Sequence, residues 1–197
     1  MRKKNIVCGV GRNDADYQVF EHAVIGGKDK IIWACPYYQV WSSMLKRCYS
    51  AKLHYNRPTY IECFVDPKWL IFSVFREWMS LHNWKGNQLD KDILCPGNKI
   101  YRPDYCIFVS SALNNFITDS RAARGEWPIG VSLHKKTGKF QATCKNPFTR
   151  KYEYLGLYSC PTDAHDVWRA KKQQHAYSYA EMQDDPRIAR ALRDRFS

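Results

Sequence analysis

Apolar residues recur at helical spacing in two segments of the first half of the chain. In residues 36–48 they fall three and four positions apart, which predicts an amphipathic helix whose polar face carries Lys46 and Arg47. A second helix is predicted from Asp66, which can cap it, and Pro67, which suits a first turn. Its broad apolar face consists of Trp69, Leu70, Phe72, Phe75, Trp78 and Met79. An aromatic stripe at this spacing indicates a packed core rather than a ligand site.

The remaining segments of the first two thirds are shorter. Residues 1–35 offer only short β-like pieces around the turn Gly26-Gly27. We predict strands over 88–94 and 105–109, joined through a Pro-Gly-Asn turn and followed by a short helix. The polar and basic residues 118–126 predict a linker.

Beyond this linker, alternation of polar and apolar residues predicts three antiparallel strands, and a helix over 163–175 follows them. A last helix opens at Asp184-Asp185-Pro186 and is rich in Arg. The pattern therefore predicts an α+β chain with a small three-stranded antiparallel sheet packed on a helix. The predicted parts are residues 1–118, residues 127–176 and a basic C-terminal helix over 177–197, and the predicted strands are 129–133, 139–145 and 152–157.

Composition places the chain among folded proteins with a polyanionic partner. Of its 197 residues 45% are hydrophobic and 15% aromatic, which argues against disorder. No apolar run reaches the roughly 20 residues of a membrane span, and the N-terminus has no signal-peptide pattern, so we expect a cytoplasmic protein. The 31 basic and 19 acidic residues give a net charge of +12, which favours nucleic acid as partner; a solvated basic surface is the alternative.

Eight cysteines occur without any CxxC pair. In a cytoplasmic chain we expect reduced and mostly buried thiols. A structural zinc ion remains a weaker alternative, with Cys35, Cys48, Cys63 and Cys106 as its candidate ligands.

Four separated motifs in residues 36–118 resemble bacteriophage proteins related to the HNH, or ββα-metal, endonucleases. They are Trp41-Ser-Ser-Met-Leu-Lys-Arg-Cys48, Cys63-Phe-Val-Asp-Pro-Lys-Trp69, Leu89-Asp-Lys-Asp92 and Tyr101-Arg-Pro-Asp-Tyr-Cys-Ile-Phe-Val-Ser110. The resemblance implies a DNA endonuclease of a phage, acting in the host cytoplasm, with an HNH-like ββα-metal motif and flanking helices. It also implies Mg²⁺ or Mn²⁺ held by Asp90 on the first strand and Asn114 on the helix, because carboxylate and amide oxygens suit these ions.

Two positions depart from that family. Lys91 stands where the family has its His general base, and Tyr105 stands where it has the Asn that braces the loop. A protonated Lys does not readily accept a proton, so Lys91 is expected either to contact phosphate or to serve as an atypical base. The catalytic candidates are therefore Lys91, Asp92 and His82, with a metal-bound water as another base.

Residues 127–175 resemble the APETALA-two-type DNA-binding domain, through Trp127-Pro-Ile-Gly-Val131, Gly138-Lys-Phe-Gln-Ala142, Tyr154-Leu-Gly-Leu-Tyr158 and Thr162-Asp-Ala-His165. In that family a three-stranded sheet contacts the major groove of double-stranded DNA. The residues expected on this face are His134, Lys135, Lys136, Lys139, Gln141, Thr143, Lys145, Arg150, Lys151 and Tyr152. Few of them are Arg, which predicts phosphate contacts more than base specificity.

The sequence therefore predicts a metal-dependent DNA endonuclease. The alternative is a catalytically inactive HNH-like DNA-binding regulator or accessory factor. A third interpretation is an adaptor that binds a host protein through exposed aromatic residues, and a homodimer also remains open.

Overall fold

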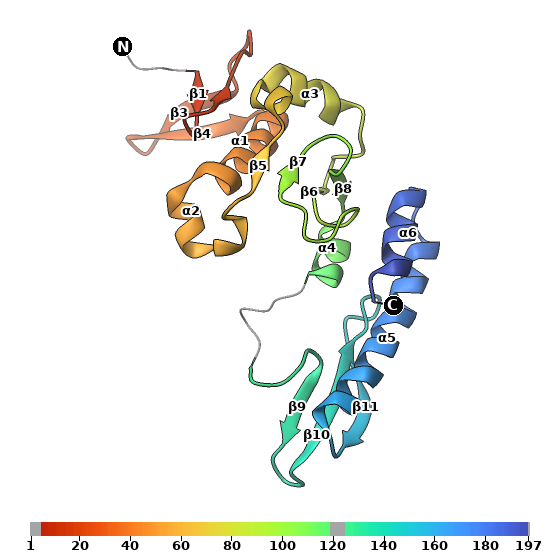
Figure 1. Cartoon of the computed structure of the whole chain (residues 1–197). Helices are drawn as coiled ribbons and strands as arrows, with labels where there is room; N and C mark the ends of the chain where they lie inside the picture. Colours follow the sequence, from red (N-terminus) through yellow and green to blue (C-terminus); the bar gives the residue numbers. More distant parts are fainter. Residues whose placement is uncertain (1–4, 119–124, 197) are drawn as a thin grey trace. The chain divides into compact units, whose positions relative to one another are not determined.

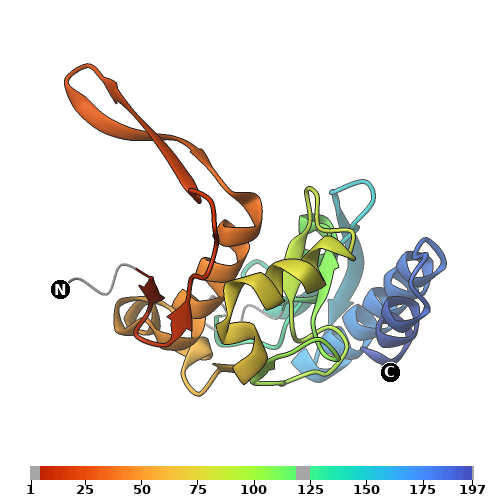
Figure 2. The same cartoon turned by 90° about the horizontal axis from the view of Figure 1, so that it is seen from above.

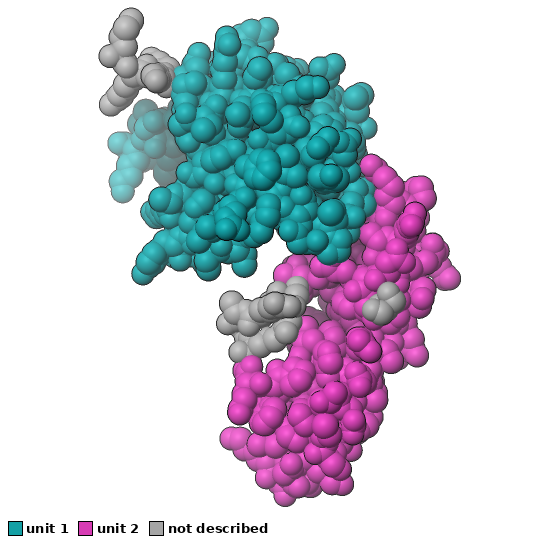
Figure 3. Space-filling view, viewed as in Figure 1, with its two compact units in different colours: residues 1–110 teal, residues 111–197 magenta. Residues whose placement is uncertain are grey.

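The computed structural model describes residues 5–118 and 125–196, so most of the predicted linker lies outside the described residues. By its internal contacts the chain divides into two compact units, residues 1–110 and 111–197 (Figure 3). The predicted α+β fold class is confirmed, since both units combine helices with small sheets (Figure 1). The domain boundaries at 118, 127 and 177 stay predictions.

Helix α1, Pro36–Tyr49, and helix α3, Phe72–Ser80, supply the core of unit 1. Most residues of the apolar stripes predicted for them are buried, and the side chains of Trp41 and Phe75 are fully inaccessible to solvent. The indole nitrogen of Trp41 donates to the carbonyl oxygen of Trp69 at 2.7 Å, so the buried polar atom is satisfied. The aromatic stripe is therefore core, as its spacing predicts.

The second predicted helix is divided in two. A 3₁₀ turn, η2, covers Pro67–Leu70 and is capped by Asp66, whose carboxylate accepts from the amide of Lys68 at 2.9 Å. Ile71 then takes an extended conformation, and α3 begins at Phe72. The first half also contains helix α2, Ala51–Asn56, and the 3₁₀ turn η1, Pro58–Tyr60.

Two pairs of short strands lie beside this core. Strand β5, Phe64–Val65, runs parallel to β7, Ile100–Tyr101, a pairing that the sequence does not predict. Strand β6, Gln88–Asp90, pairs antiparallel with β8, Ile107–Val109. The predicted strand over 88–94 ends early, at Asp90, because the side chain there turns the following backbone.

An N-terminal hairpin is longer than the sequence predicts. After β1, Ile6–Val7, and β2, Gly11–Arg12, the strands β3, Phe20–Ile25, and β4, Lys28–Ala34, form a separate two-stranded sheet. The turn Gly26-Gly27 has φ values of 62° and 74°, the left-handed conformation that a tight hairpin requires. The hairpin extends away from the helices of unit 1 (Figure 2).

Unit 2 begins with helix α4, Ser111–Ile117, and continues with the predicted three-stranded antiparallel sheet. Its strands are β9, Val131–His134, β10, Lys139–Lys145, and β11, Tyr152–Tyr158, with β10 in the middle. The sequence places these three strands to within about two residues. Gly130 has a φ of 82° and lies against the ring of Trp168, so an added Cβ would overlap that ring.

Helix α5, Pro161–Glu181, is longer at both ends than the predicted 163–175. Its second half is covered by helix α6, Pro186–Asp194, whose Ile188 and Leu192 are buried. Gln173 of α5 also donates to the carbonyl oxygen of Arg193 at 2.6 Å. The predicted start of α6 is confirmed, since Asp185 caps it by accepting from the amide of Arg187 at 2.8 Å. Among the described helices, none has the length and apolar character needed to cross a membrane.

Candidate functional site

In the part of unit 2 that the structure describes, helix α5 packs on one face of the sheet and no helix covers the other. Residues paired across antiparallel strands point to the same side, and the pairs Lys139–His134 and Lys145–Tyr152 alternate with those that face α5. This open face consists of Ser132, His134, Lys139, Gln141, Thr143, Lys145, Tyr152, Tyr154 and Leu157. Six of the residues predicted to contact DNA therefore share one face.

The opposite face of the same sheet packs on α5. Ala142 and Cys144 of β10 are buried there. Glu153, the only acidic residue of the three strands, points the same way, and its carboxylate lies 3.0 Å from Nζ of Lys171 and 3.5 Å from Nε2 of His175. The open face is consequently free of carboxylates and carries only neutral and basic side chains.

Two tyrosines stand out from the open face. Tyr152 is 72% exposed and Tyr154 is 62% exposed, which is unusual for side chains with this much apolar surface. Nζ of Lys145 lies 5.9 Å from the ring centre of Tyr152. The remaining predicted contacts, Lys135, Lys136, Arg150 and Lys151, are exposed in the two loops that join the strands.

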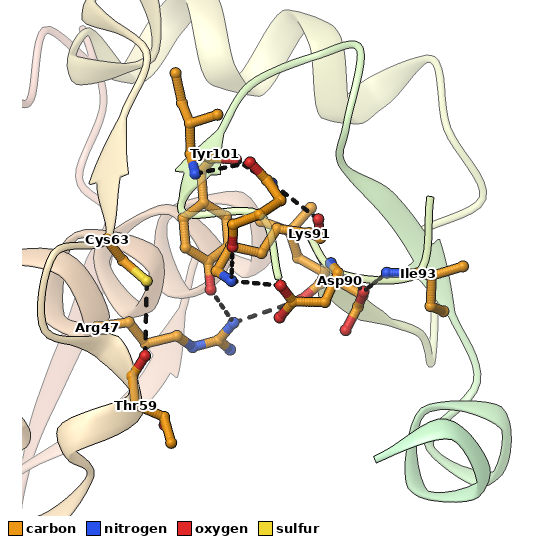
Figure 4. Close-up of polar contacts among 11 residues, drawn as sticks. Arg47, Thr59, Cys63, Asp90, Lys91, Ile93 and Tyr101 are labelled. Atoms are coloured by element: carbon orange, nitrogen blue, oxygen red, sulfur yellow. Dashed lines mark hydrogen bonds and ion pairs between the residues drawn. The ribbon is translucent and has the colours of Figure 1, made fainter. Parts of the chain in front are cut away.

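In unit 1, strand β6 ends at Asp90, whose side chain accepts hydrogen bonds from the backbone that follows. Oδ1 accepts from the amides of Asp92 and Ile93, both at 2.7 Å (Figure 4). Burial raises the pKa of this carboxyl group, while the two amide donors act in the opposite direction. Within residues 5–118 and 125–196, Oδ2 of Asp90 accepts no hydrogen bond. One oxygen thus shapes the loop and the other remains available to a ligand.

Lys91 is buried, with only 5% of its surface exposed. Its Nζ donates to Oδ1 of Asp92 at 2.7 Å and to the carbonyl oxygen of Asn98 at 2.5 Å (Figure 4). It also lies 5.9 Å from the ring centre of Tyr101. The ammonium group is therefore held inside the loop, where it neutralises Asp92.

Asn98 braces the loop between β6 and β7. Its amide nitrogen donates to the carbonyl oxygens of Lys91 at 2.9 Å and Ile100 at 2.7 Å, and its Oδ1 accepts from the amide of Ile100 at 3.0 Å. Sequence reasoning looked for a bracing Asn at position 105 and missed this one. The Pro-Gly-Asn turn was a visible signal, but its side-chain partners depend on the folded loop.

Arg47 is a second residue that the sequence did not identify. It was expected on the polar face of its helix. The side chain is half-buried there, and Nη1 donates to the carbonyl oxygen of Leu89 and the hydroxyl of Tyr101, both at 3.4 Å (Figure 4). Among the residues that the structure describes, Arg47 forms no ion pair. The side-chain hydrogen bonds of this cation go to neutral groups, so its remaining nitrogens can bind an anionic ligand.

His82 follows α3 and packs on Trp78, with 4.3 Å between the ring centres and the rings tilted by 34°. Its Nδ1 lies 2.7 Å from the carbonyl oxygen of Trp78. Because a carbonyl oxygen only accepts, Nδ1 carries a proton, so the lone pair of the neutral imidazole, which a general base needs, lies on Nε2. Trp78 also contacts strand β8, since its ring centre lies 5.7 Å from that of Phe108.

The predicted metal ligands belong to different units, since Asp90 lies in unit 1 and Asn114 in helix α4 of unit 2. Their sharing of one ion stays a prediction. In the described part of the chain, no three His, Cys, Asp or Glu side chains form a group that could hold a metal ion. The four cysteines considered for zinc are all buried, and burial raises the pKa of Cys48 and Cys106 to about 12, so these thiols are protonated at neutral pH.

Comparison with known proteins adds no relative: the chain matches no family model, no curated protein and no solved structure.

Proposed function

We propose that the protein binds double-stranded DNA through the open face of β9, β10 and β11. The observation that carries this proposal is that basic and acidic side chains lie on opposite faces of the sheet. Lys139 and Lys145 lie on the uncovered face, whereas Glu153 is turned toward α5 and neutralised there by Lys171. Such sorting leaves a positive and sterically accessible sheet, which complements a phosphate backbone.

The side chains of this face divide into two kinds of contact. The lysines would neutralise phosphates and release counterions, which gives affinity without sequence information. Gln141 and Thr143 lie between them and can hydrogen-bond base edges in a major groove. The exposed rings of Tyr152 and Tyr154 add apolar contact area. The face therefore suits moderate sequence preference on top of electrostatic binding.

Charge reversal at the open face tests this proposal. Lys139→Glu should weaken binding to a short duplex about three- to tenfold at low salt and reduce the slope of log K against log salt by about one. Arg169→Glu is the matched control, because Arg169 is exposed on α5, the helix that covers the opposite face. Fluorescence anisotropy over a KCl series measures both quantities. Equal salt slopes for Lys139→Glu and the wild type would remove the sheet from the interface.

We further propose that unit 1 makes the protein an HNH-like endonuclease that hydrolyses phosphodiester bonds with Mg²⁺ or Mn²⁺. Support comes from the available Oδ2 of Asp90, at the end of a strand that pairs antiparallel with β8 and is followed in the chain by α4. The carboxylate of Asp90 would hold the ion, which would supply positive charge to the scissile phosphate, and Asn114 as a second ligand stays a prediction from the resemblance.

The chain's own groups would complete this chemistry. Arg47 is placed to bind a phosphate oxygen with nitrogens that its partners Leu89 and Tyr101 do not use. His82, with the lone pair of Nε2 available, is the better candidate for the base that accepts a proton from water. Lys91 and Asp92 neutralise each other, and in this proposal they shape the loop that presents Asp90.

Nicking of supercoiled plasmid in Mg²⁺ or Mn²⁺ tests the endonuclease proposal. Asp90→Asn keeps an oxygen for the amides of Asp92 and Ile93 but weakens the ligand charge, so cleavage should fall about 100-fold or more. Asp104→Asn is the control, because Asp104 is an exposed carboxylate paired only with Arg102 in the described structure. Activity that survives Asp90→Asn would exclude Asp90 as a metal ligand.

The alternative function is that of a catalytically inactive DNA-binding regulator or accessory factor. The observation that favours it is the buried Lys91, whose ammonium already has two oxygen partners where the resembled family has a free His. In this case duplex binding persists, plasmid is not cut, and calorimetry detects no Mg²⁺ or Mn²⁺ binding to the protein–DNA complex. The plasmid assay and calorimetry together separate the two functions.

A further inference from the structure

The hairpin β3–β4 exposes apolar side chains that the fold of unit 1 does not use. Val24 is 75% exposed, Ile31 and Ile32 are each 56% exposed, and Ile25 is 50% exposed. Only the base of the hairpin is anchored, where Phe20 packs on Tyr38 with 5.2 Å between the ring centres. A two-stranded ribbon is marginally stable in water, and clustered exposed apolar groups mark interaction sites.

The two faces of the hairpin differ. Residues paired across the strands share a face, so Val24, His22 and Asp29 lie with Ile31 on one side, which we call the histidine face. Its two charged or chargeable side chains bond to each other, since Nδ1 of His22 lies 3.0 Å from Oδ2 of Asp29. The polar side chains of this face therefore satisfy each other within the hairpin.

The other side, which we call the lysine face, has polar cover. Lys28 lies across from Ile25 and Lys30 lies across from Ala23, so lysine stems can cover the apolar groups while the ammonium groups stay in water. The lysine face also holds Trp33, which is 41% exposed and lies across from Glu21. On the histidine face, Val24 and Ile31 lie across from Asp29 and His22, whose shorter side chains bond to each other, and Val24 is more exposed than any apolar side chain of the lysine face.

The net charge of the hairpin favours a protein over DNA as its binding partner. Residues 20–34 carry two Lys, one Asp and one Glu, a net charge of zero in a chain of +12. DNA interfaces are strongly positive, whereas the centres of protein interfaces are apolar and poor in charge. A neutral apolar arm is also the part through which two copies of a basic chain can approach with the least repulsion.

We propose that the histidine face of β3–β4 binds the same face of a second copy of this chain. Two stacked hairpins place Val24 and Ile31 of one copy against those of the other, and each His22–Asp29 pair stays satisfied within its own hairpin. The contact is isologous, so it closes as a dimer. The two stacked hairpins share an apolar layer that a single two-stranded hairpin lacks.

The strength of this contact follows from its size. A hairpin of about six residues is about 20 Å long, so one face covers a few hundred Å² at most. Stable dimers bury about 800 Å² on each partner. The dimer is therefore reversible, with a dissociation constant above about 1 µM.

Sedimentation velocity of the full chain from about 1 to 300 µM tests the proposal. The mass should rise from 23.2 kDa toward twice that value. Val24→Glu should abolish the rise, because it places a charge in the apolar contact. Ile25→Glu is the matched control on the lysine face and should leave the dimer intact. Circular dichroism checks that both variants fold.

Two outcomes would overturn the proposal. One is a wild-type protein that stays monomeric at every concentration, or a dimer that Val24→Glu does not weaken. The other is a loss of duplex affinity in both variants at concentrations where the wild type is monomeric, which would place DNA on the hairpin. The proposed DNA binding by the sheet of unit 2 is measured separately and does not depend on either result.

Discussion

Lys172 on α5 is a partly buried cation that lies against aromatic rings and, among the described residues, pairs with no carboxylate. Its Nζ lies 3.7 Å from the ring centre of Phe116 and 5.6 Å from that of Phe196. Burial lowers the pKa of Lys172 to about 8, against about 10.4 in an unfolded chain. Between these two values the unfolded state binds a proton that the native state has released. In this window the contribution of Lys172 to stability rises with pH, and below it the native state bears the cost of the buried charge.

Replacement of Lys172 by Met tests whether the stability contribution of Lys172 rises with pH. At pH 7 the variant should unfold with a free energy about 1–3 kcal/mol higher than the wild type, because the buried charge is gone. The difference should shrink as the pH rises from about 8 to 10.5. Chemical denaturation over this pH range measures it, with the exposed Lys135→Met as control. A difference that does not vary with pH would show that Lys172 titrates as a normal lysine.

At the scale of elements, the loop from β6 to β7 is set by side chains that satisfy its backbone. Asp90 accepts two amides at the start of the loop, and Asn98 bonds three backbone groups near its end. The buried ammonium of Lys91 ties the two ends together. The position of the Asp90 carboxylate therefore depends on Asn98, even though the two side chains share no hydrogen bond.

Asn98→Ala should consequently destabilise unit 1 by about 2–3 kcal/mol, since it leaves buried backbone groups without partners. It should also reduce any metal-dependent cleavage by displacing Asp90. Asn87→Ala is the control, because the side chain of Asn87 makes one exposed hydrogen bond, to the carbonyl oxygen of Asn83 at 2.8 Å. Urea denaturation compares the two. An effect no larger than that of Asn87→Ala would mean that the loop holds its shape without Asn98.

For the whole molecule, positive charge is divided evenly. Unit 1 has 16 basic and 10 acidic residues and unit 2 has 15 and 9, so each carries +6. Binding that uses both units should depend on salt more steeply than the open face of the sheet alone can explain. Both units are expected to contribute, since the proposed cleavage chemistry lies in unit 1.

A variant with Lys135, Lys136, Lys139 and Lys145 all changed to Gln separates the two contributions. Its salt slope on duplex DNA should fall by up to about 3.6, at about 0.9 for each phosphate contact, but a residual slope from unit 1 should remain. Anisotropy titrations from low to high KCl measure both slopes. A variant that no longer responds to salt would confine DNA binding to the sheet.

The spacing of neighbouring residues in the sequence was enough to predict several helices and strands and part of the open face of the sheet. The sequence predicted α1, the three strands of unit 2 and the start of α6 at Asp184-Asp185-Pro186, because periodicity and helix-start signals involve neighbouring residues. It also placed Lys139, Gln141, Thr143 and Lys145 together, since alternate residues of a strand share a side. That face is the part of the candidate site that the sequence alone determined.

The surroundings of Asp90 and of the loop from β6 to β7 were decided by the tertiary structure. The half-burial of Arg47, the neutralisation of Lys91 and the brace by Asn98 all depend on groups brought together by the folded loop or by distant strands. The parallel pairing of β5 with β7 joins segments more than thirty residues apart, and it carries no short-range signal. Sequence spacing fixes which residues share an element, whereas long-range packing fixes which charges are buried, paired or left for a ligand.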